Sequence, residues 1–135
     1  MWFARGWLRI IALPAALGLA PEALLAADFD GSKALLCATI EAHGCDAGDD
    51  CLRVLPTRVG LPQFLRIDFA KQAIIGPKRT TPIVSIERSP GQILLQGTEL
   101  GIGWTVALDT ASGKMNATLV NREVAFAVYG ACTPQ

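Results

Sequence analysis

The sequence lacks the motifs that would assign it directly to several large classes of protein. It contains no Cys-x-x-Cys, which argues against thiol–disulfide exchange, and no Gly-x-Ser-x-Gly elbow, which argues against the common hydrolase nucleophile. It has one histidine, and its 12 basic residues are balanced by 12 acidic residues. Because binding to nucleic acid or to an anionic membrane surface needs a basic excess, neither partner is expected.

Long apolar runs are also missing, since none approaches the ~20 residues that span a bilayer as a helix. The longest run, 10–20, follows the positive residues Arg5 and Arg9 and is followed by small residues. This order is typical of a cleaved secretory signal peptide. We therefore predict a signal peptide over 1–27, a single mature domain over 28–135, no membrane span after cleavage, and a periplasmic or secreted location.

Export would place all four cysteines of the chain in an oxidising compartment, where disulfides form and persist. Four cysteines allow three connectivities, and spacing alone does not choose among them. We favour Cys45 with Cys51, which would close an acidic loop, and Cys37 with Cys132, which would join the first element to the last strand. By the loss of chain entropy in the unfolded state, the Cys45–Cys51 bridge should stabilise the fold by about 2 kcal/mol and the Cys37–Cys132 bridge by ~5 kcal/mol.

Most of the mature chain alternates large apolar residues with small or polar ones, the period-two pattern of a half-buried strand. The stretch 102–109 is the clearest case, and it follows a second strand-like stretch, 92–97, after a short loop containing glycine. Residues 34–43 are ambiguous between helix and strand. We favour a strand there, because four apolar residues take every second position: Leu36, Ala38, Ile40 and Ala42.

These patterns predict an all-β fold, an antiparallel β-sandwich or a flattened up-and-down barrel of about seven short strands, stabilised by disulfides. Residues 28–33 are expected to form a loose lead-in, and Asp109 to cap a hairpin loop over 109–114. Two prolines and a glycine argue against a long element over 52–62. The expected strands are 34–43, 64–69, 82–88, 92–97, 102–109, 115–120 and 124–129, and a turn at 71–72 is expected to lead from the second of these into the short apolar segment 73–75.

Ligand-type side chains are most concentrated in the stretch 41–51. Calcium would use carboxylate and carbonyl oxygens of a flexible loop, and zinc would use the histidine with cysteines only if those stayed reduced. The spacing matches no established loop such as the twelve-residue calcium hand. A solvated, disulfide-closed turn is therefore favoured, and no cofactor is expected. The alternative metal ligands are Glu41, His43, Asp46, Asp49 and Asp50.

Two other groups are candidate functional residues. A catalytic role for His43 would need a nucleophile and a third, orienting group, and although serines are present, no flanking motif supports this chemistry. The basic pair Lys78 and Arg79, in a loop expected over 76–80, would suit an anionic partner. The sequence thus favours binding over catalysis.

Several short segments resemble a group of small exported bacterial proteins that carry no assigned activity. They are Cys37, Cys45 and Cys51, FLRIDF at 64–69, LLQG at 94–97, GW at 103–104 and GAC at 130–132. The resemblance implies export, disulfides and an all-β fold, and it carries over no active site. In size, disulfide content and strand number the chain is also similar to the small barrel inhibitors of lysozyme, a likeness of fold alone.

The expected function is that of an exported, soluble, non-catalytic binding or interaction module of the bacterial cell envelope. Its partner would be a protein or a small-molecule ligand, and the sequence does not indicate an oligomeric state. Two alternatives stay open. One is an inhibitor of an envelope-directed hydrolase such as lysozyme, and the other is a metal-binding structural protein that uses the acidic stretch 41–51.

Overall fold

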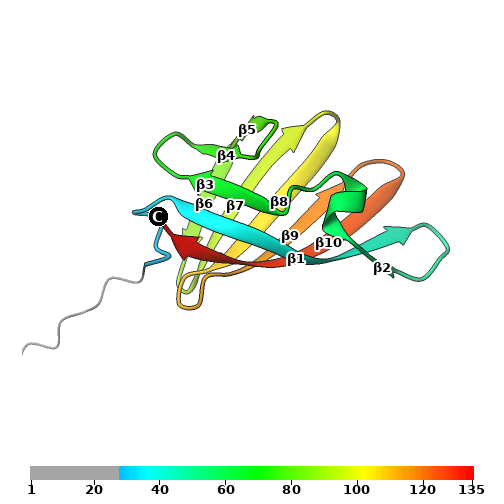
Figure 1. Cartoon of the computed structure of the whole chain (residues 1–135), viewed down its shortest axis with the longest axis horizontal. Helices are drawn as coiled ribbons and strands as arrows, with labels where there is room; N and C mark the ends of the chain where they lie inside the picture. Colours follow the sequence, from blue (N-terminus) through cyan, green and yellow to red (C-terminus); the bar gives the residue numbers. More distant parts are fainter. Residues whose placement is uncertain (1–27) are drawn as a thin grey trace, which may run out of the picture.

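A computed structural model describes residues 28–135, and the expected signal peptide over 1–27 lies outside this range. The described chain forms one curled half-barrel of antiparallel strands and a short 3-10 helix (Figure 1). The elements are β1 (Leu35–Asp46), β2 (Leu52–Val54), η1 (Pro56–Val59), β3 (Phe64–Asp68), β4 (Ala73–Ile75), β5 (Thr80–Pro82), β6 (Ser85–Ser89), β7 (Gln92–Glu99), β8 (Ile102–Asp109), β9 (Lys114–Val120) and β10 (Val124–Pro134).

The predicted disulfide-stabilised, antiparallel all-β fold is confirmed, but the expected number of strands is wrong. Ten strands occur within residues 28–135. β2, β4 and β5 have three residues each, too few for an alternating pattern to stand out in the sequence. The single strand expected over 82–88 begins at the last residue of β5 and covers most of β6, and only residues 83–84 between them form a link.

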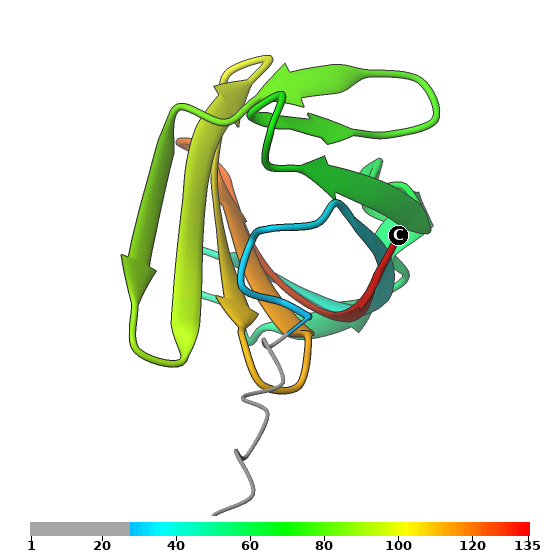
Figure 2. The same ribbon diagram turned by 90° about the vertical axis from the view of Figure 1, so that its left-hand side faces the viewer.

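The sheet has the order β5-β4-β3-β1-β10-β9-β8-β7-β6, with β2 added to β1. Its two outer strands, β5 and β6, follow each other in the chain. The link between them contacts β7, where the Val84 N–H donates to the Gln96 carbonyl at 2.8 Å. The Thr81 hydroxyl donates to the Thr98 carbonyl at 3.4 Å, so β5 also lies against β7. The sheet therefore curls around an interior (Figure 2).

The first and last strands of the domain are neighbours at the centre of the sheet. β1 pairs with β10 along almost its whole length, from Leu35 opposite Pro134 to Asp46 opposite Val124. Cys37 and Cys132 are opposite each other in this ladder and form a disulfide. The second disulfide joins Cys45 and Cys51, so both bridges favoured from the sequence are present.

The core fills the inside of the curl, as the alternating patterns require. On β8 the side chains of Trp104, Val106 and Leu108 are buried, while the residues between them are more exposed. The neighbouring strands supply the rest of the interior by the same alternation. The largest fully buried side chains are Leu35, Ile67, Ile93, Leu95, Leu108, Met115 and Val128.

A β-bulge in β1 changes which residues of that strand face inward. The register with β10 shifts between Thr39 and Glu41, which leaves Ile40 as the extra residue. Before the bulge Cys37 and Thr39 are buried, and after it Ala42 is buried. The apolar set that favoured a strand is therefore on the outer face as far as Ile40, whose side chain is 65% exposed. The strand was predicted correctly, but its buried face was not.

One end of the half-barrel is closed by residues 28–34, which cross it in Figure 2. Phe29 packs against the core and reaches Gly113, where a Cβ atom would collide with its ring. The Gly113 carbonyl accepts a hydrogen bond from the Cys132 N–H at 2.8 Å. The expectation of a loose lead-in is therefore wrong, because a single aromatic residue in a polar segment covers this end of the core.

At the same end, Asp109 caps the loop between β8 and β9, as its position in the sequence predicted. One of its carboxylate oxygens, Oδ1, accepts hydrogen bonds from the Ser112 N–H at 2.7 Å and the Ala111 N–H at 2.9 Å. These bonds, that to Ser112 first, lower the pKa of Asp109 below its ordinary value of 3.8.

Among the residues that the structure describes, we find no helix with the length and apolar character needed to cross a bilayer.

We predict that the two disulfides contribute unequally to stability. Cys37→Ala with Cys132→Ala opens a covalent loop whose ends are 95 residues apart, and should lower the free energy of unfolding by roughly 5 kcal/mol. Cys45→Ala with Cys51→Ala opens one whose ends are 6 residues apart, and should cost about 2 kcal/mol. Urea unfolding of both variants measures this order, and equal losses would contradict it.

We predict that the contribution of Asp109 to stability depends on pH. Because its pKa is lowered in the folded state, its contribution is present above 3.8 and is lost as the pH falls through the folded value. Asp109→Asn keeps an acceptor oxygen but does not titrate. The difference in unfolding free energy between wild type and variant should be largest at neutral pH and shrink below 3.8. A difference independent of pH would refute the assignment.

Candidate functional site

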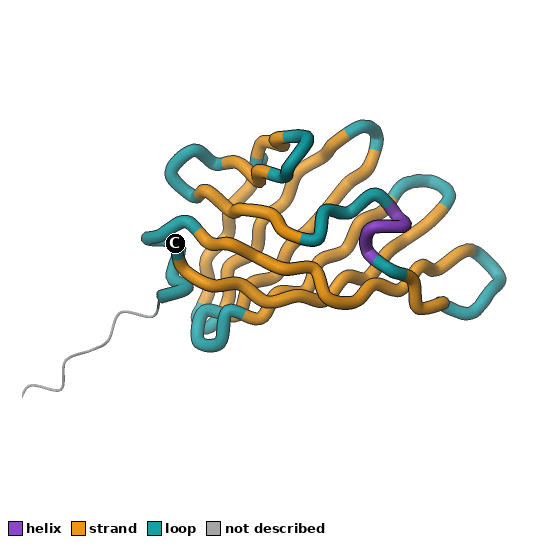
Figure 3. Tube along the Cα trace, in the orientation of Figure 1, coloured by secondary structure: helices purple, strands orange, loops and turns teal. Residues whose placement is uncertain are grey.

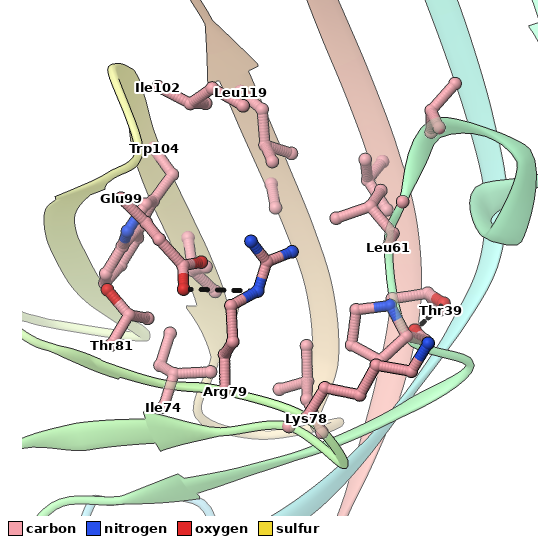
Figure 4. Close-up of a pocket in the computed structure, with 18 of the residues that line it drawn as sticks. Thr39, Leu61, Ile74, Lys78, Arg79, Thr81, Glu99, Ile102, Trp104 and Leu119 are labelled. Atoms are coloured by element: carbon pink, nitrogen blue, oxygen red, sulfur yellow. Dashed lines mark hydrogen bonds and ion pairs between the residues drawn. The ribbon is translucent and has the colours of Figure 1, made fainter.

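The interior of the half-barrel contains a cavity of about 450 Å³. It lies toward the end opposite Phe29, where β8 begins and β9 ends. Three connecting segments surround its mouth, namely η1, the β4–β5 loop and the β7–β8 turn. Figure 4 shows this region and the side chains around it.

The walls of the cavity are mostly apolar. They are formed by inward-facing residues of several strands, and β9 contributes three at every second position. Polar side chains deep in the wall are few, and the hydroxyls of Thr39 and Thr81 donate to backbone carbonyls. The apolar wall consists of Leu65, Ile74, Ile102, Trp104, Val106, Met115, Ala117, Leu119 and Val128.

Trp104 forms the wall on the β7 side and depends on a glycine opposite it. Its indole ring lies over Gly97, where a Cβ atom would collide with the ring and would lie 2.8 Å from the Pro82 carbonyl oxygen. Trp104 is only 8% exposed, and its Nε1 is buried without a hydrogen-bond partner among the described residues. Gly97 thus lets the indole lie flat against β7 and leaves the space beside it open.

On the opposite side, the segment that follows η1 is fixed over β1 near the bulge. The Thr39 hydroxyl donates to the Pro62 carbonyl at 2.7 Å, and the Thr39 N–H donates to the Gln63 carbonyl at 3.0 Å. The segment turns back at Gly60, whose φ of 79° is unfavourable for residues with a side chain. This arrangement places Val59 and Leu61 on the cavity rather than in the core.

The mouth carries the charged residues of the site. Arg79 and Lys78 come from the β4–β5 loop, which is closed by a 2.8 Å hydrogen bond from the Gly76 N–H to the Arg79 carbonyl. The Arg79 Nε lies 3.7 Å from a carboxylate oxygen of Glu99. In Figure 4 the guanidinium extends over the cavity, with its terminal nitrogens directed away from Glu99. The two residues predicted to bind a partner therefore lie at the mouth of the cavity.

The second half of the mouth is a tight turn between β7 and β8. Leu100 and Gly101 both have positive φ, 49° and 78°, which is the two-residue hairpin geometry that matches the strand twist. Leucine is rare in this conformation, and its side chain is 77% exposed. It lines the mouth of the cavity, where an apolar side chain on a rigid turn would contact an incoming apolar molecule.

The acidic stretch lies elsewhere, and the structure brings only part of it together. His43 Nε2 lies 2.7 Å from a Glu41 carboxylate oxygen, and Arg53 binds the other oxygen at 3.1 Å. The hydrogen bond from His43 is the largest cause of the lowered pKa of Glu41. The His43 ring also makes an edge contact with Tyr129. None of these four residues lines the cavity.

The remaining predicted metal ligands do not join this cluster. Asp46, Asp49 and Asp50 are exposed on or beside the loop that the Cys45–Cys51 disulfide closes. Within residues 28–135, no group of three or more histidine, cysteine or carboxylate side chains is placed to hold a metal ion. The hydrogen bonds of the described residues also link His43 to Glu41 and not to a serine.

Comparisons of the chain with protein-family models, with curated proteins and with solved structures find no match. The resemblance to small exported bacterial proteins stays a prediction from the sequence.

We predict that Gly97 is required for the wall of the cavity. Gly97→Ala places a Cβ against the indole and the Pro82 carbonyl, so it should lower the unfolding free energy by about 1–3 kcal/mol and shift the emission of Trp104. Gly103→Ala is the control, because its Cβ would have no neighbour closer than 3.8 Å. Unchanged emission and stability in Gly97→Ala would show that the wall can adapt.

Proposed function

We propose that this protein is an exported binding protein that holds a small, largely apolar ligand in the cavity of its half-barrel. The observation that carries the proposal is the cavity itself. Its volume of about 450 Å³ falls in the range of about 300–1,000 Å³ of small-molecule sites. Such sites are mostly apolar with a few polar groups that orient the ligand, and mouths of β-barrels are a common place for them.

The construction of the site supports binding rather than catalysis. The charged groups are at the mouth, and the deep hydroxyls of Thr39 and Thr81 donate to the backbone, so among residues 28–135 the interior presents no nucleophile with a neighbouring base. Leu100 and Trp104 offer apolar surface at and below the mouth. Burial of apolar ligand surface there is favourable by roughly 25 cal/mol per Å² before the costs of association.

The two disulfides support the proposed location. Bridges of this kind form and persist in oxidising compartments such as the periplasm or the cell exterior. Both are in the domain that the sequence predicts to remain after removal of residues 1–27. They also suit a binding domain whose core is partly hollow, because they add stability that does not depend on packing.

A second candidate rests on a different part of the surface. The hairpin between β1 and β2 extends beyond the rest of the sheet in Figure 3, is closed by the Cys45–Cys51 disulfide, and displays three exposed carboxylates nearby. A stiff acidic loop of this kind would suit the cationic cleft of a hydrolase, the inhibitor alternative raised from the sequence. An interaction of this type would not depend on the cavity.

We predict that the protein binds a neutral apolar dye, N-phenylnaphthylamine, in the cavity. Ala117→Phe fills the cavity from β9 and should weaken binding by roughly tenfold or more, about 1.4 kcal/mol. The matched control is Thr118→Phe, which adds similar bulk to the next residue of β9, on the exposed face. Fluorescence titration measures both affinities, and thermal unfolding checks that both variants fold.

The proposal fails if the wild type does not bind the dye, or if Ala117→Phe and Thr118→Phe bind it equally well. Equal binding by the two variants would place the dye outside the cavity. Loss of an interaction with a hydrolase on removal of the loop carboxylates, with the Ala117→Phe variant still active, would favour the inhibitor candidate instead.

A further inference from the structure

We propose that the ligand of the cavity is an amphiphile with an apolar body and one anionic head group, which Arg79 and Lys78 hold at the mouth. This inference rests on the proposed function and specifies the ligand class. The head group is a carboxylate or a phosphate monoester, both of which present negatively charged oxygens. The apolar body is a chain that fills the interior.

The charged side chains of the site are confined to its mouth. The inner wall is formed by apolar residues, whereas both cations come from one short loop, the β4–β5 connection. A ligand that is apolar throughout would leave these cations in contact with its surface or with water. A ligand with one charged end would place that end at the mouth and the rest of the molecule inside, so this distribution fixes an orientation as well as a class.

The terminal N–H groups of Arg79 can donate hydrogen bonds to such a head group. Its ion pair among the described residues is with Glu99, and this contact uses Nε at 3.7 Å, beyond hydrogen-bond distance. Figure 4 shows the two terminal nitrogens directed away from Glu99, over the cavity. A guanidinium can bind a carboxylate or phosphate in a bidentate manner through such terminal N–H groups. The side chain is half exposed, so a ligand can reach it without a rearrangement of the core.

The sum of charges at the mouth favours an anion. Glu99 balances one of the two cations, Lys78 and Arg79, so the mouth carries one net positive charge. An anionic head group would neutralise this charge, whereas a cationic one would be repelled by it. Glu99 also limits the attraction of simple anions from solution, because its carboxylate already lies beside Arg79. Tight binding of a ligand should therefore require both an apolar body and an anionic head group.

The loop that carries the two cations has a defined shape. The hydrogen bond between the Gly76 N–H and the Arg79 carbonyl closes it, and Gly76 and Pro77 both line the cavity. A Cβ at Gly76 would lie 3.4 Å from the same carbonyl oxygen, so the turn is tight. The backbone thus places Arg79 and Lys78 on the mouth before a ligand arrives, which lowers the ordering cost of binding.

The test compares probes that share one chain and differ in their head group. Dodecanoate, dodecyl phosphate, dodecanol and dodecylamine are titrated below their micelle-forming concentrations, with binding followed by Trp104 emission in the mature protein and by calorimetry. We expect one or both anionic probes to bind about ten- to a hundredfold more tightly than dodecanol, the gain of a charge-assisted hydrogen-bonded pair. Dodecylamine should bind more weakly than dodecanol.

Two variants locate the head group. Lys78→Gln with Arg79→Gln should remove the preference for the anionic probes and leave the affinity for dodecanol within about threefold of wild type, roughly 0.65 kcal/mol. The control is Lys71→Gln with Lys114→Gln, which removes the same number of positive charges at the closed end of the half-barrel. This control should keep the preference, since a general loss of positive charge would affect both variants alike.

The outcomes separate this inference from the proposed function. Binding of dodecanol with no preference for either anionic probe, or a preference that survives in the Lys78 and Arg79 variant, overturns the inference and leaves a neutral-ligand binding protein. Absence of binding for all four probes overturns both. A preference for dodecanoate over dodecyl phosphate, or the reverse, identifies which anion the mouth accepts.

Discussion

The pairing of the first strand with the last is the constraint on which the rest of the structure depends. β1 and β10 lie side by side at the centre of the sheet, and the Cys37–Cys132 disulfide joins them across the ladder. With these strands held together, the segments on either side must curl toward each other, because the link from β5 to β6 is too short to let the outer strands separate. The interior, and with it the cavity, exists because the sheet is bent in this way.

The long strands could be predicted because each repeats its alternation over several periods. In β8, β9 and β10 the apolar residues at every second position do face the interior, as at Trp104, Met115 and Val128. Local pattern fails where a strand is shorter than two periods, as in β2, β4 and β5. It also fails in β1, where the apolar residues up to Ile40 lie on the outer face and a bulge then turns Ala42 inward, a switch that leaves no mark in the period itself.

Only part of the candidate site could be predicted from the sequence. Lys78 and Arg79 stood out as a basic pair in a loop, but the reason for their importance is spatial, since Glu99 and the apolar wall come from strands distant in the sequence. Thr39 and Gly97 gave no signal as single residues. One fixes η1 above β1 and the other makes room for Trp104, and both roles appear only when the segments are placed in three dimensions. The acidic stretch, by contrast, stands out in the sequence, but among the described residues only its Glu41 and His43 come together, and no group of three ligand side chains forms.

The cross-linked pairing of β1 with β10 also has a consequence for how the domain responds to proteases. Cys37 and Cys132 enclose nearly all of the described chain in one covalent ring, and the Gln135 N–H donates to the Ala34 carbonyl at 2.9 Å just outside it. A single cut in any surface loop between the two cysteines would open the ring without releasing a fragment. The domain can therefore be cut once by a protease and remain one covalently linked molecule. Because Ala34 and Gln135 are adjacent, circular permutation of the domain should be tolerated.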